Sequence, residues 1–196
     1  MQRLAETTLP GAAAVALADA RRARAQVARA GVWLSEVWAG ADAPPAFRWE
    51  QLAQMPAWAL DTPAALERLT LLAGALFAAP SLRVCLDPAP LLRVRELIGA
   101  AALDHVLAVP GLPPVAPPWP AGAGGERDTL RAWGGPLLLA SLDDPALRAS
   151  VARVLDQAEP AAPLLPAAAA ARLVRLALHV LDSAGARAAP AEEEMP

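Results

Sequence analysis

The stretch between Arg68 and Arg83 constrains the fold of this chain more than any other. It holds 14 consecutive uncharged residues, Leu69 to Leu82. Beyond Thr70 a helix of this composition is apolar on every side, and such a helix is stable only when other elements surround it. A membrane-spanning helix needs about 20 apolar residues, so this run is too short to span a bilayer. The stretch therefore predicts the central core helix of a soluble, cytosolic protein.

The composition favours helices over strands throughout the chain. Of the 196 residues, 51 are Ala and 32 are Leu, both strong helix formers, whereas the chain has two Phe and no Tyr. Charged residues make up 19% and the mean hydropathy is +0.33, which argues against wholesale disorder. We predict an all-α fold, a single globular multi-helix domain with a Pro/Gly-rich loop between two helical halves.

The predicted domain covers residues 12–182. Residues 1–11 read as an irregular N-terminus without a secretory signal, and residues 183–196, which contain three glutamates, as a disordered acidic tail. Residues 110–125 contain six prolines and form the predicted loop. Apolar spacings of three or four residues predict helices over 12–39, 62–80, 91–109, 127–142, 145–158 and 167–182, with a short helix over 49–60.

The residues that carry catalytic or metal chemistry are few. His105 lies on an apolar helix face and His179 on a polar one, and neither has a pair of cysteines nearby. We interpret Cys85 as a buried small residue and Asp143-Asp144 as a helix cap before Pro145. The sequence therefore predicts no enzyme: no catalytic, cofactor-binding or metal-binding residues, and no cofactor.

Two features are candidates for binding another protein. Arg21, Arg22, Arg24 and Arg29 fall on one side of the first predicted helix, either as a solvated face or as a docking site for an acidic partner. The net charge of −3 and the absence of interleaved aromatic residues argue against nucleic acid. Trp119, between prolines, is either an interface anchor or a ring packed on its own domain.

The stretch from Leu69 to Pro120 resembles a known family. It reads LLAGALFAAPSLRVCLDPAPLLRVRELIGAAALDHVLAV from residue 71 to 109, followed by PPWP at 117–120. This stretch resembles the SctK/YscK family of type III secretion in four features: an apolar helix, an Arg-x-Cys segment, a Pro-Leu helix start at Pro90 and a proline-flanked Trp119. The resemblance covers about a quarter of the chain.

The resemblance implies a non-enzymatic adaptor of the injectisome, which is the protein-transport apparatus of type III secretion and acts in virulence. Members of the family are cytoplasmic, lie peripheral to the inner membrane through the secretion apparatus, and belong to its sorting platform. They link the inner-membrane ring protein SctD, through its cytosolic domain, to the pod protein SctQ, without nucleic acid or direct membrane insertion. A helical ligand-binding or regulatory domain unrelated to secretion is the alternative that the residues leave open.

Overall fold

The protein is all-α over the residues that the computed structural model describes, which are Gly31 and residues 55–110, 118–120, 125–157 and 163–188. The chain divides into two compact units, Met1–Asp61 and Thr62–Pro196, where the sequence predicts one domain over 12–182. In the first unit the described element is the 3₁₀ helix η1 (Ala57–Leu60), within the predicted helix over 49–60. The predicted helix over 12–39, apart from helical Gly31, and the N-terminus over 1–11 lie outside the described residues.

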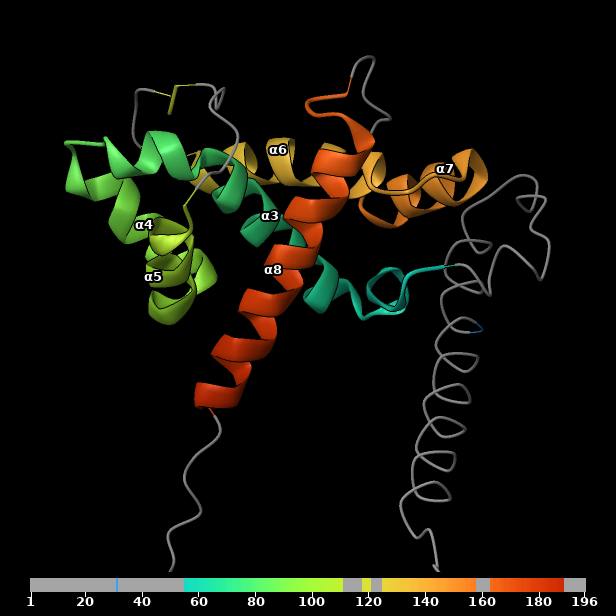
Figure 1. Ribbon diagram of the computed structural model, residues 1–196, viewed down its shortest axis with the longest axis horizontal. Coiled ribbons are helices and arrows are strands. Elements are labelled where there is room, and N and C mark those ends of the chain that lie inside the picture. Colours follow the sequence, from blue (N-terminus) through green and yellow to red (C-terminus); the bar gives the residue numbers. More distant parts are fainter. Residues whose placement is uncertain (1–30, 32–54, 111–117, 121–124, 158–162, 189–196) are drawn as a thin grey trace, which may run out of the picture. The chain divides into compact units, whose positions relative to one another are not determined.

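Six α-helices make up the described part of the second unit (Figure 1). They are α3 (Pro63–Arg83), α4 (Pro88–Ile98), α5 (Ala100–Ala108), α6 (Glu126–Ala140), α7 (Pro145–Val154) and α8 (Ala167–Ala188). The long helix α3 packs against α4, α5, α6 and α8. Its residues from Leu69 to Ala79 are all buried, which confirms the predicted central core helix.

Three helices begin with the same local signal, an oxygen-bearing cap followed by proline. The Thr62 hydroxyl accepts a hydrogen bond from the Ala65 N–H at 3.3 Å at the start of α3. The carboxylates of Asp87 and Asp144 accept from Ala89 N–H at 2.9 Å and Ala146 N–H at 2.7 Å. Proline at the first helical position loses only an N–H that has no partner within the helix. The cap predicted before Pro145 is confirmed, with Asp144 as the capping residue.

Two predicted helix boundaries near the core are wrong. Helix α3 continues through Pro80 to Arg83. One proline near the end of a helix removes a single backbone bond, and burial of Leu82, which is 1% exposed, offsets this loss. The helix predicted over 91–109 is two helices, α4 and α5, because the chain turns at Gly99 with φ of 91°, a conformation that favours glycine.

Helices α3 and α6 cross in backbone contact. A Cβ atom added at Gly74 would overlap the carbonyl of Leu130, and one added at Gly134 would overlap the carbonyl of Thr70. Because neither glycine has a side chain, the backbone of the neighbouring helix packs directly against it. Helix α6 runs unbroken through Gly134, Gly135 and Pro136.

The two C-terminal helices differ from their predicted bounds. Helix α7 ends at Val154, and its C-cap Leu155 is followed by Asp156 in the left-handed region at φ of 49°. Helix α8 continues to Ala188, six residues past the predicted end at 182, because the Ala-rich sequence up to Ala188 still favours helix. The rest of the predicted tail, residues 189–196, lies outside the described residues.

Candidate interaction surface

The turn between α3 and α4 carries the most exposed large apolar side chains of the described residues. Val84 is 75% exposed, Leu86 is 99% exposed, and Leu92 in α4 is 54% exposed. We call these three residues the apolar edge. The turn exists because α3 ends at Arg83 and Asp87 caps the next helix, so Val84, Cys85 and Leu86 belong to neither helix. Single exposed leucines are ordinary, but three large apolar side chains exposed within nine positions make this edge the candidate contact site of the described residues.

Arg83 holds this turn against the end of α5. Its Nε donates a hydrogen bond to the carbonyl of Leu107 at 2.8 Å, and its Nη2 donates to the carbonyls of Val106 and Val109. These carbonyls lie in the last turn of α5 and at its C-cap Val109, where backbone acceptors lack helical partners. The arginine thus satisfies the end of one helix and fixes the base of the apolar edge. A pre-organised edge loses less entropy on binding than a free loop does.

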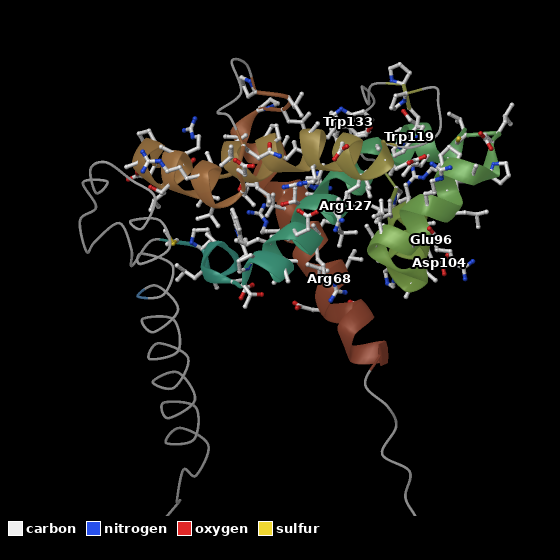
Figure 2. All side chains as sticks on the ribbon, turned by 180° about the vertical axis from the view of Figure 1, so that it is seen from behind. Arg68, Glu96, Asp104, Trp119, Arg127 and Trp133 are labelled. Carbon is white, nitrogen blue, oxygen red and sulfur yellow. The ribbon has the colours of Figure 1, made fainter. Side chains whose placement is uncertain are left out.

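Trp119 lies on its own unit. Its half-buried ring meets that of Trp133 in α6 edge to face, with the ring centroids 5.7 Å apart (Figure 2). Trp133 in turn meets Phe77 of α3 at 6.0 Å. The three rings connect residues 118–120 to α6 and to the central helix. Trp119 thus contacts its own unit through Trp133, while part of its ring is exposed to solvent.

The other predicted residues are spread over the structure. Arg21, Arg22, Arg24 and Arg29 lie outside the described residues. His105 is half-buried and its Nδ1 lies 2.8 Å from the Ala101 carbonyl oxygen, whereas His179 is exposed. The prediction that Cys85 is buried is wrong, because the thiol lies half-buried in the exposed turn and donates to the Asp87 carbonyl. Within the described ranges, His, Cys, Asp and Glu form no group of three that is suited to a metal ion.

Two carboxylates join α6 to the helices beside it. Glu67 of α3 pairs with Arg127 at 3.1 Å and with Arg131 at 3.3 Å, both in α6. Glu126, the first residue of α6, is 7% exposed and pairs with Arg93 of α4 at 3.4 Å. Its own backbone N–H, the Gly125 N–H and the Arg93 charge hold the pKa of Glu126 below its usual value, although burial acts in the opposite direction.

We expect Glu126 to make stability depend on pH in the acid range. A carboxyl whose pKa is lowered by folding stabilises the protein fully above its ordinary pKa of 4.5, and this contribution disappears as the pH falls through the lower folded value. Glu126→Gln should therefore lower the urea midpoint at pH 7 and lower it less at pH 3.5. Exposed Glu96→Gln is the control. An equal loss at both pH values for Glu126→Gln would contradict the prediction.

Helix α3 also passes a simple test for a membrane-spanning helix. By length and composition it is the one described helix that is long and apolar enough to cross a bilayer, but 72% of its apolar window is buried inside the fold. The core helix of a soluble protein passes the same test. Helix α3 is buried because it packs against α4, α5, α6 and α8.

Sequence reasoning missed the apolar edge, although a signal for it was present. Asp87-Pro88 is the same cap-and-proline pair that marks the starts of α3 and α7. Reading it as a helix start would have left Val84, Cys85 and Leu86 in a turn.

Comparison of the chain with family models, curated proteins and solved structures finds no match.

Proposed function

We propose that this chain is a non-enzymatic adaptor of the cytosolic type III secretion sorting platform, which links the inner-membrane ring protein SctD to the pod protein SctQ. It acts in the cytoplasm and is peripheral to the inner membrane through the apparatus. The resemblance of residues 69–120 to the SctK/YscK family supports the proposal. The observation that carries it is the apolar edge, which lies within that same stretch.

An adaptor works through surface complementarity, and the apolar edge has the properties that this requires. Leu86 projects almost completely into solvent from a turn that Arg83 fixes from behind. Burying a leucine side chain contributes roughly 1.5–3 kcal/mol, so one partner pocket that covers Leu86 and Val84 gains a large part of a binding free energy. A side chain contributes most to binding where it fills a partner's pocket from which water is fully excluded.

The proposal predicts that replacing the two turn residues weakens binding without unfolding the protein. The double variant Val84→Ser and Leu86→Ser should bind the purified cytosolic domain of SctD, or SctQ, at least about tenfold more weakly by calorimetry. Its melting temperature should stay unchanged, because both side chains are exposed in the free protein.

Leu164→Ser is the matched control, since Leu164 is 41% exposed in the segment before α8. It should bind both partners like the wild type. Failure of the wild-type chain to bind either protein would overturn the proposed function. Normal binding by the double variant would move the interface away from the apolar edge.

A further inference from the structure

The outer face of α8 carries positive charge that the fold does not use. Arg172, Arg175 and His179 are exposed at spacings of three and four residues, so they lie on one side of the helix. Asp182 follows one turn later on the same side. The opposite side holds the buried residues Ala170, Leu173, Val174, Ala177 and Val180. It faces α3, α6 and α5, and Figure 1 shows α8 crossing in front of α3 and α6.

Four other arginines of the second unit have structural partners, whereas Arg68, Arg95 and Arg153 are exposed like Arg172 and Arg175 but stand on other helices. Arg93, Arg127 and Arg131 pair with Glu126 or Glu67, and Arg83 binds the end of α5. Within the described part of the chain, no carboxylate pairs with Arg172 or Arg175. Two guanidinium groups one helical turn apart are thus free to bind a ligand, and guanidinium pairs with carboxylates in a two-pronged geometry.

We propose that this outer face of α8, defined by Arg172, Arg175 and His179, is a docking surface for an acidic protein segment. The charge of the face selects the occupant, because a carboxylate-bearing partner complements the two free arginines. The whole chain has a net charge of −3, so it repels a polyanion except where positive charge is concentrated. No large apolar side chain accompanies the arginines as an exposed anchor on the described part of α8, which disfavours a membrane surface.

This surface is separate from the apolar edge. The edge belongs to the α3–α4 turn and α4, whereas α8 packs against α3, α5 and α6. An adaptor needs two surfaces, and these two differ in chemistry: one apolar, the other charged and sensitive to salt. As the second surface of an adaptor, the outer face of α8 rests on the proposed function. Its test, however, uses no secretion protein, so the two proposals fail separately.

The test measures binding of the full chain to a fluorescein-labelled peptide of ten glutamates, by fluorescence anisotropy at low ionic strength. We expect saturable binding that weakens as salt is added. The double charge reversal Arg172→Glu and Arg175→Glu should weaken it about tenfold. The matched control is the double reversal Arg95→Glu and Arg153→Glu, which changes the net charge equally at exposed arginines of α4 and α7. The control should stay within about twofold of the wild type.

Three outcomes would overturn the proposal. The first is absence of peptide binding by the wild-type chain, and the second is equal weakening by both double variants, which would reflect net charge alone. The third is tighter binding of a duplex DNA of ten base pairs, or of vesicles with phosphatidylserine, than of the peptide. Tighter binding of the DNA or of the vesicles would identify that ligand, and not an acidic protein segment, as the occupant of the surface.

Discussion

Gly134→Ala is expected to destabilise the second unit severely, although it adds only one methyl group. The new Cβ atom would overlap the carbonyl of Thr70, and backbone cannot move aside as a flexible side chain does. Helices α3 and α6 would have to separate along a contact in which Gly74 also lies against the backbone of fully buried Leu130. Overpacking of this kind costs roughly 3 kcal/mol. A fall in melting temperature of about 10 °C should accompany it, measured by circular dichroism.

The neighbouring glycine supplies the control for this experiment. A Cβ atom at Gly135 would meet only the end of the Gln157 side chain, which is free to rotate away. Gly135→Ala also gains up to about 1 kcal/mol of helix propensity, and this offsets loss of the hydrogen bond from Gln157 to the Arg131 carbonyl. Its stability should remain close to that of the wild type. Similar melting temperatures for the two variants would contradict the close crossing of α3 and α6.

Trp133→Ala is expected to have the next largest effect. Its indole ring lies between Phe77 of α3 and Trp119, at centroid distances of 6.0 and 5.7 Å. Trp133 is half-buried, and its truncation loses two ring contacts together with the apolar area that they cover, which costs roughly 2–3 kcal/mol. Chemical denaturation should show this loss, and Trp133→Phe should recover part of it by keeping an aromatic ring.

A double-mutant cycle with Trp119→Ala isolates the contact between the two tryptophans. If Trp119 packs on Trp133 in solution, the two substitutions should be non-additive, with a coupling of about 1 kcal/mol. The single variant Trp119→Ala should then lose stability. Strict additivity, together with weaker binding of a partner protein by Trp119→Ala, would instead identify Trp119 as an interface anchor.

The helix starts follow from short-range chemistry and were therefore accessible from the sequence. A hydroxyl or carboxylate followed by proline satisfies backbone donors within three residues, as Thr62 and Asp144 show. The apolar run of α3 likewise had to be buried, whichever other elements of the fold pack against it. Helix ends were less predictable, because the continuation through Pro80 depends on how well Leu82 is buried by the rest of the fold.

The two candidate surfaces differ in the same way, because one follows from local sequence and the other from tertiary structure. Periodicity alone places Arg172, Arg175 and His179 on one side of a helix, so the charged face of α8 is a local property of the sequence. The exposure of Leu86 is not, since an isolated Val-Cys-Leu segment is as compatible with a buried strand or turn as with a solvent-facing edge. That segment lies outside the core only in the folded protein, where Arg83 beside it binds the end of α5.

The sequence by itself determined that the chain is helical, where most helices begin, and that α3 lies in the core, because propensity, capping and hydrophobic burial act over a few residues. The tertiary structure alone decided which glycines are essential and which leucines remain exposed. Gly134 and Gly135 are adjacent and chemically identical, yet only the first contacts the backbone of another helix. That difference arises from the packing of segments some 60 residues apart, Thr70 and Gly134, which no local pattern encodes.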